Sequence, residues 1–127
     1  MNTGNLSLHH VTIIIPRGST EAAVQRYENV LELRRTDMLA PGKTGAWLMV
    51  DDRAQVHLSE RNEPGHPDSH FALVVRSFDD TLRRVAEHGA KWNEQEDLFG
   101  GRRGFTRDPA GNRVELLEAT GALLTYL

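Results

Sequence analysis

Apolar positions along this chain of 127 residues follow the same pattern twice. The run HVTIII at residues 10–15 resembles HFALVV at 70–75, and each is a histidine followed by apolar residues typical of a β-strand. A helical pattern follows each run, EAAVQRYENVLEL after the first and FDDTLRRVAEH after the second. This self-similarity indicates that the chain consists of two copies of one small unit.

Polar residues mark where the two predicted helices begin and end. Ser19 or Thr20 is expected to cap the first helix, and Ser77 with Asp80 forms an S-x-x-D capping signal for the second. Gly89 is expected to end the second helix. Apolar stripes on both helices predict a shared core, and their members are Ala23, Tyr27, Val30 and Leu31 in the first and Phe78, Leu82 and Val85 in the second.

Each half ends in two strand-like runs that are joined by a turn. GAWLMV and AQVHLSE flank the turn at residues 51–53, and RRGFTR and RVELLE flank the turn DPAGN at 108–112. Trp47 and His57 are 10 positions apart, as are Phe105 and Glu115. The spacing predicts a duplicated β-α-β-β unit, with room for an additional short strand near residues 36–40 and 92–96.

The chain is therefore predicted to form one α+β domain that covers residues 1–127. The first module spans about 6–60, a linker rich in proline and glycine spans 61–69, the second module spans about 70–118, and a tail follows at 119–127. The apolar ending GALLTYL is expected to pack on its own chain or on a partner.

Composition narrows the classes of partner. A net charge of −3 argues against binding to nucleic acid. No apolar stretch approaches the roughly 20 residues that span a bilayer, and no secretory signal is visible, so a cytoplasmic protein without a membrane partner is expected. The absence of cysteine excludes disulfides, thiolate metal sites and thiol nucleophiles.

Four ligand-type side chains occupy equivalent positions in the two halves. His10 and His70 begin their strands, and His57 and Glu115 lie in the fourth strand of each half. Because side chains alternate along a strand, each of these residues shares a mixed face, opposite an apolar face that can take a helix. If the two halves pack around an axis, the four side chains can converge on one divalent metal such as Fe, Mn, Co, Ni or Zn.

Two of these interpretations stay open at the level of sequence. His57 is either a fourth metal ligand or a hydrogen-bond donor to a ligand. Trp47, the counterpart of Phe105, belongs either to the core or to an aromatic wall of the site.

Arginines at 102, 103 and 107 follow Gly100-Gly101 and allow two interpretations. They form a solvated strand edge, or Arg103 and Arg107, which share a face with Phe105, hold a substrate carboxylate or phosphate. An inward arginine needs an anion, either the substrate or an acid such as Glu60 or Glu94.

Together these motifs resemble the vicinal oxygen chelate superfamily, which includes glyoxalase I, extradiol dioxygenases, methylmalonyl-CoA epimerase and the fosfomycin and bleomycin resistance proteins. The resemblance rests on LHHV, RYENVLEL, HFALVV and DPAGNRVELL and covers almost the whole chain. It implies two βαβββ modules that form an open mixed barrel around a metal. His10, His70 and Glu115 match the common metal ligands of the family, and His57 matches a position that is a ligand in some members only.

Departures from the family patterns restrict the reaction. Extradiol dioxygenases usually carry a tyrosine where this chain has Phe105, and the potassium loop of fosfomycin thiol transferases has no counterpart in EQEDLFGGRRGF. Bleomycin-binding members usually lack the metal ligands. The resemblance therefore favours a lyase or isomerase of glyoxalase type, in which a metal binds two substrate oxygens and a carboxylate moves a proton.

In this interpretation Glu115 is the catalytic carboxylate, and the substrate is a small, oxygen-rich, anionic metabolite. The residues expected to contact substrate are Thr12, Trp47, Arg103, Phe105 and Arg107. A homodimer is expected, because small sheets leave edges that need cover and two-module members of the family commonly pair, sometimes with the metal site built from both chains. The alternatives are a resistance protein of the fosfomycin or bleomycin type, by binding or thiol transfer, and third an extradiol-type dioxygenase.

Overall fold

The computed structural model describes residues 5–37 and 44–126, and it contains the predicted unit twice. The first module comprises β1 (His10–Pro16), α1 (Thr20–Leu31), β2 (Arg34–Thr36), β3 (Ala46–Met49) and β4 (Gln55–Arg61). The second comprises β5 (His70–Val75), α2 (Phe78–Glu87), β6 (Asn93–Gln95), β7 (Arg103–Arg107) and β8 (Arg113–Glu118). A 3-10 helix, η1 (Gly121–Tyr126), follows. Both additional short strands exist, as β2 and β6, although residues 38–40 of the first prediction lie outside the described part.

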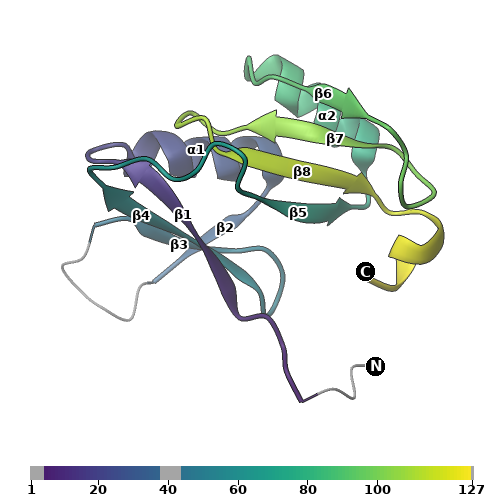
Figure 1. Cartoon of the computed structure of the whole chain (residues 1–127), viewed down its shortest axis with the longest axis horizontal. Helices are drawn as coiled ribbons and strands as arrows, with labels where there is room; N and C mark the ends of the chain where they lie inside the picture. Colours follow the sequence, from purple (N-terminus) through teal and green to yellow (C-terminus); the bar gives the residue numbers. More distant parts are fainter. Residues whose placement is uncertain (1–4, 38–43, 127) are drawn as a thin grey trace.

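The strands form two separate mixed sheets with the orders β1-β4-β3-β2 and β5-β8-β7-β6. In each sheet the first strand runs parallel to the last, and the other neighbours are antiparallel. The sheets remain open and do not close into one barrel (Figure 1). The α+β class and the paired βαβββ modules are therefore confirmed.

Strand register explains the ten-residue spacing seen in the sequence. Trp47 pairs with His57 across β3 and β4, and Phe105 pairs with Glu115 across β7 and β8. Paired residues on antiparallel strands project from the same face of the sheet. The repeat therefore places an aromatic ring beside a ligand-type side chain in each module.

The helix-covered faces of both sheets share one hydrophobic core. Ile13 and Ile15 of β1, Tyr27 of α1 and Val114 and Leu116 of β8 belong to a single buried cluster. Tyr27 is fully buried, and its hydroxyl donates to Asp108 Oδ2 at 2.9 Å. Burial, with the Asp108 charge, raises the pKa of Tyr27 well above its usual value, so this hydroxyl stays protonated.

The two helices also contact each other directly. Arg84 of α2 donates to the Val30 carbonyl at 3.0 Å and pairs with Glu32 at 2.7 Å. Arg26 of α1 donates to the carbonyl of Arg107 in the other module at 3.0 Å. The two modules therefore join through their helical sides, and the faces of the sheets that carry the ligand-type residues point away from this shared core.

Ser19 and Ser77 are the N-cap residues of α1 and α2, as predicted. Neither Ser19 nor Ser77 makes a side-chain capping hydrogen bond. Asp80 pairs instead with Arg83 at 2.7 Å, because these residues are neighbours on the helix surface. Thr20 Oγ1 donates to Glu60 of β4 at 2.6 Å. Among the described helices, none is long and apolar enough to cross a membrane.

Candidate metal and substrate site

His10, His57 and Trp47 form a stack of rings on the open face of the first sheet. The ring centroids of His10 and His57 are 3.9 Å apart at an interplanar angle of 11°, and those of Trp47 and His57 are 4.4 Å apart at 4°. His57 is the buried member, at 9% exposure, and its Nε2 lies 2.7 Å from Gln55 Oε1. Trp47 is therefore part of the candidate site as well as a partly buried residue.

Burial, with the nearby His10 and His9, lowers the pKa of His57 to about 4. Desolvation and neighbouring imidazoles both disfavour the imidazolium form. His57 is consequently neutral at pH 7, the state in which a ring nitrogen can bind a metal.

His9 is a further histidine beside this stack of rings. Its Nδ1 lies 2.9 Å from His10 Nδ1, and its ring centroid is 6.4 Å from that of His57. β1 begins only at His10, so His9 lies just before the strand. Outside a strand, alternation does not govern the direction of a side chain.

His70 and Glu115 form the second pair, on the open face of the other sheet. His70 Nε2 lies 3.2 Å from Glu115 Oε1, and Arg103 Nη1 donates to Glu115 Oε2 at 2.7 Å. The Glu115 side chain is 11% exposed and that of Arg103 is 14% exposed. The carboxylate is thus held from two sides, with one oxygen toward an imidazole and the other toward a guanidinium.

Phe105 connects this pair to a second arginine. The His70 ring meets the Phe105 ring edge-on at 5.1 Å, and the Arg113 guanidinium lies 3.9 Å from the centroid of Phe105. Arg103 also donates to the carbonyl of Glu96 at 2.7 Å. Phe105 therefore lies between His70 and Arg113, and its expected contact to substrate stays a prediction.

The acids that hold the arginines differ from those suggested by the sequence. Arg103 pairs with Glu115, whereas Glu60 binds Thr20 and Glu94 binds Arg102. Arg107 donates to the Gly111 carbonyl at 2.7 Å within the DPAGN turn. The expected anion for Arg103 is thus an internal carboxylate that belongs to the proposed ligand set.

The four ligand-type residues form two pairs and not one cluster. Within residues 5–37 and 44–126, no three histidine, aspartate or glutamate side chains are close enough together to hold a metal. The donor chemistry nevertheless fits a divalent first-row ion, because it combines imidazoles, one of them held neutral, with a buried carboxylate. Each open face carries half of a conventional ligand set.

Thr12 lies beside the second pair. It lines a hollow of about 180 Å³ together with His66, His70 and Arg113. Thr12 shares the open face of β1 with His10, so this hollow extends from the first sheet toward β5. The position is consistent with the expected contact to substrate, which stays a prediction.

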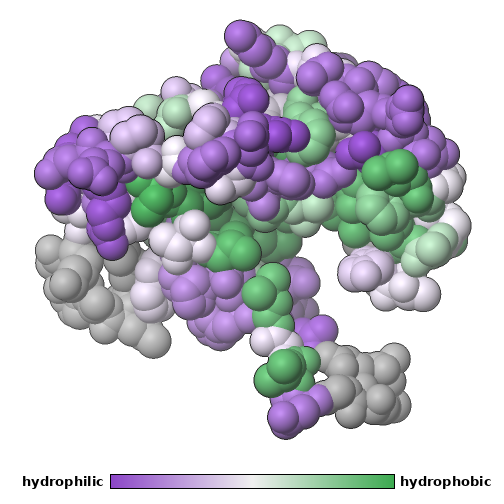
Figure 2. Space-filling model, viewed as in Figure 1, coloured by the Kyte–Doolittle hydropathy of each residue, from purple (hydrophilic) through white to green (hydrophobic). Residues whose placement is uncertain are grey.

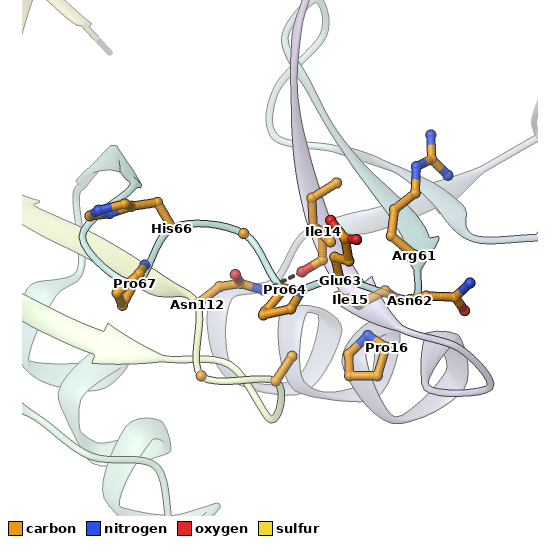
Figure 3. A pocket seen from close by; sticks show the side chains of 13 residues that line it. Ile14, Ile15, Pro16, Arg61, Asn62, Glu63, Pro64, His66, Pro67 and Asn112 are labelled. Carbon is orange, nitrogen blue, oxygen red and sulfur yellow. Dashed lines mark hydrogen bonds between the residues drawn. The ribbon is translucent and has the colours of Figure 1, made fainter.

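A second hollow, of about 250 Å³, lies where the linker crosses the end of β1 (Figure 3). Asn112 links the two modules there, because its side-chain amide donates to the Ile14 carbonyl of β1 at 2.9 Å. The same amide donates to Asp108 Oδ2 at 3.0 Å. Figure 3 shows the His66 ring turned away from Ile14. The Nδ1 atom of His66 accepts a hydrogen bond from the backbone amide of Asp68 at 3.1 Å. This hollow is a structural junction between the modules.

Sequence comparison supports one family. The model of the Glyoxalase/Bleomycin resistance protein/Dioxygenase superfamily matches residues 7–116. No curated protein matches the sequence.

Solved structures of known proteins share the fold at low sequence identity. A glyoxalase family protein from Bacillus anthracis has a TM-score of 0.81 at 21% identity, over 93% of this chain and 98% of its own. An antibiotic binding protein from Streptomyces sp. CB03234, TnmS3, has a TM-score of 0.71 at 18% identity, over 92% and 98%. Lactoylglutathione lyase from Agrobacterium tumefaciens has a TM-score of 0.67 at 19% identity, over 92% and 96%.

Proposed function

Because the chain belongs to the Glyoxalase/Bleomycin resistance protein/Dioxygenase superfamily, we propose that it is a metal-dependent lyase or isomerase of glyoxalase type. The proposed substrate is a small, oxygen-rich, anionic metabolite. The observation that carries the proposal is the Glu115 carboxylate, which is buried and oriented by Arg103 and His70 at the centre of an open face. A buried carboxylate fixed in this way is suited to proton transfer or metal binding.

The proposed ligands are His10, His70 and Glu115, with His57 as the fourth ligand. His57 also contacts Gln55, and the alternative role for it is a hydrogen-bond donor to a ligand. Bound there, a divalent ion would supply a Lewis acid for two oxygens of the substrate. Glu115 would take a proton from the carbon beside those oxygens and return it at the neighbouring position. Arg103 would keep the carboxylate in place during this transfer.

The two half sites are proposed to meet in a homodimer. The helical sides of the two modules pack against each other within the chain. The open faces of the sheets are therefore proposed to be covered by another molecule. The outer edges of β1 and β5 pair with no other strand of the described chain, and unpaired edges favour association. A second copy would bring its His70 and Glu115 to His10 and His57 of the first.

Exposed apolar side chains at both ends of the described chain support this association. Leu8 is 69% exposed and Tyr126 is 71% exposed, and both border a groove of about 780 Å³ with Val50, Leu73 and Val75. Figure 2 shows apolar side chains on the N-terminal segment and beside the C-terminal helix, on either side of an open hollow. Of the apolar ending, Leu123 alone is buried among the residues described.

Metal titration tests the site directly. Calorimetric titration of metal-stripped protein with Zn²⁺ or Ni²⁺ should give one site per chain, and His70→Ala and Glu115→Ala should each weaken binding by about 100-fold or more. His88→Ala is the matched control, because His88 contacts the carbonyl of Arg84 at the end of α2. Unchanged affinity in both ligand variants would refute the metal site.

Turnover assays test the reaction class. Metal-loaded protein is to be assayed with 2-oxo aldehyde thiol adducts, acyl-CoA thioesters, catechols and fosfomycin. We expect metal-dependent turnover of a 2-oxo aldehyde adduct or a thioester, abolished in Glu115→Gln. Turnover of catechols would instead assign the dioxygenase alternative.

A ligand-binding protein without turnover is the second candidate. The parallel stack of Trp47, His57 and His10 offers a flat aromatic surface for a planar ligand, and the structural likeness to TnmS3 extends over 92% of the chain. Tight stoichiometric binding of a planar compound, with no product in any assay, would favour this candidate.

A further inference from the structure

The open face of the second sheet carries a group of cations that the metal site does not use. A hollow of about 560 Å³ beside Phe105 is lined by Lys91, Arg107 and Arg113, with the amides of Asn93 and Gln95. None of its lining residues is acidic. This concentration of positive charge is unusual in a chain whose net charge is −3.

Arg113 is poorly compensated within the described chain. Its side chain is 21% exposed, and its guanidinium packs on the Phe105 ring at 3.9 Å. Its ion pair is with Asp68, at 3.7 Å, and that carboxylate is 78% exposed. A contact this long with a solvated acid contributes little, and none of the five N–H donors makes a hydrogen bond to another described residue.

Apart from the exposed Asp68, the carboxylates near this group already have other partners. Glu115, the closest acid on the same face of β8, already accepts from Arg103 and faces His70. Glu94 accepts from Trp92 and Arg102. Arg107 donates to the Gly111 carbonyl and lines the hollow. Lys91 makes no ion pair with any residue described.

We propose that the hollow formed by Lys91, Phe105, Arg107 and Arg113, named here the anion pocket, binds a compact oxyanion, a carboxylate or a phosphate. A planar guanidinium on a ring presents its N–H edge to such a group, and amides and a lysine can complete the contacts. The anion pocket assigns a role to Arg113 and Lys91, which sequence reasoning did not include in the site.

The pocket also limits the shape of the proposed substrate. Arg113 and Glu115 are two residues apart on one strand face, so their side chains leave the sheet ~7 Å apart. This inference about the substrate rests on the proposed function. The substrate would place its reacting oxygens at Glu115 and a terminal oxyanion at Arg113, ~7 Å away.

Anion binding can be tested without any metal. Metal-stripped protein is to be titrated with inorganic phosphate, and separately with succinate, at constant ionic strength, with amide chemical shifts in ¹H–¹⁵N spectra as the readout. We expect saturable shifts at Asn93, Phe105 and Arg113 with at least one of the two anions. Tighter binding of inorganic phosphate would assign a phosphate as the natural group, and tighter binding of succinate would assign a carboxylate.

Variants separate a specific pocket from general electrostatics. Arg113→Gln should weaken anion binding by about tenfold, Lys91→Gln by several-fold, and Arg113→Lys should retain an intermediate affinity. Arg102→Gln is the control, because Arg102 lies on the other side of the sheet and pairs with Glu94 and Asp79. Lys91 is exposed, so its variant tests the pocket even if changes at Arg113 impair folding.

The outcomes are distinct from those of the metal experiments. His70→Ala should keep anion binding while losing metal affinity. Shifts that never saturate with either anion, or an equal loss in Arg102→Gln and Arg113→Gln, would overturn the anion pocket and leave the metal site standing. Anion binding together with no metal binding would refute the proposed function alone.

Discussion

At the scale of single residues, the centre of the candidate site is an acid with two competing partners. Glu115 accepts from Arg103 at 2.7 Å and lies 3.2 Å from His70. A carboxylate that is nine-tenths buried needs such compensation, because an unpaired buried charge is strongly unfavourable. Arg103 therefore acts as a positioning residue that holds the Glu115 carboxylate in its orientation.

Replacing Arg103 tests whether the buried Glu115 carboxylate depends on this guanidinium. In the absence of metal, Arg103→Gln is expected to lower the free energy of unfolding by about 1–3 kcal/mol, because Glu115 loses its guanidinium partner. Added Zn²⁺ should raise the melting temperature more in this variant than in the parent, because a cation then supplies the missing charge. Thermal unfolding with and without Zn²⁺ measures both effects.

Arg102→Gln is the matched comparison for this prediction. The ion pairs of Arg102 with Glu94 and Asp79 involve side chains that are 45% and 91% exposed, so their loss should change stability by less than about 1 kcal/mol. Equal stabilisation of parent and Arg103→Gln by Zn²⁺ would show that Arg103 does not share Glu115 with the metal.

At the scale of elements, the start of α1 is fastened to β4 by Glu60. The buried carboxylate accepts from Thr20 Oγ1 at 2.6 Å. The Thr20 hydroxyl, followed by the Gly18 amide, lowers the pKa of Glu60 below its usual value. Because the folded-state pKa lies below the unfolded-state pKa, the charged carboxylate stabilises the fold above the unfolded value of about 4.3.

This linkage predicts how a neutral substitute behaves with pH. Glu60→Gln should be less stable than the parent at pH 7, and the difference should shrink as the pH falls below about 4.3 and through the lowered pKa of Glu60. Urea unfolding at pH 7 and pH 3 measures the two differences. Glu63→Gln, at an exposed position of the linker, serves as the control. A gap between Glu60→Gln and the parent that does not change with pH would contradict the prediction.

At the scale of the whole molecule, the direction of the two open faces determines where a metal site can form. Arg26, Tyr27 and Arg84 join the helical sides of the modules within one chain. The His10–His57 pair and the His70–Glu115 pair lie on open faces, which a second copy would bring together in the proposed homodimer. Closed two-fold dimers supply two equivalent sites in this way.

Mixing variants tests whether each site uses both chains. His10→Ala and His70→Ala homodimers should each lack intact sites, whereas a mixed dimer regains one site from the unaltered modules. After refolding an equal mixture, metal binding should recover to about one quarter of the parent's sites. Calorimetry on the mixture gives this number, and light scattering reports the dimer. No recovery, or a monomer at micromolar concentration, would refute a site shared between chains.

The local pattern of this sequence was sufficient for the fold and for the sheet faces on which the candidate ligands lie. Strand alternation assigned His10, His57, His70 and Glu115 to open faces, and the equal spacings of Trp47–His57 and Phe105–Glu115 anticipated their pairing. These features are local, since they depend on the period of a strand and on the length of a hairpin.

Tertiary structure alone decided which groups meet. The contact between Tyr27 and Asp108 joins the two modules across 81 positions of the sequence. It leaves the two pairs of candidate ligands on faces that point away from the shared core. The choice of Glu115 as the partner of Arg103, and the placing of Lys91 beside Arg113, likewise depend on how β6, β7 and β8 align. Periodicity determines the face on which a side chain lies, but contacts between strands and modules depend on the packing of the whole chain.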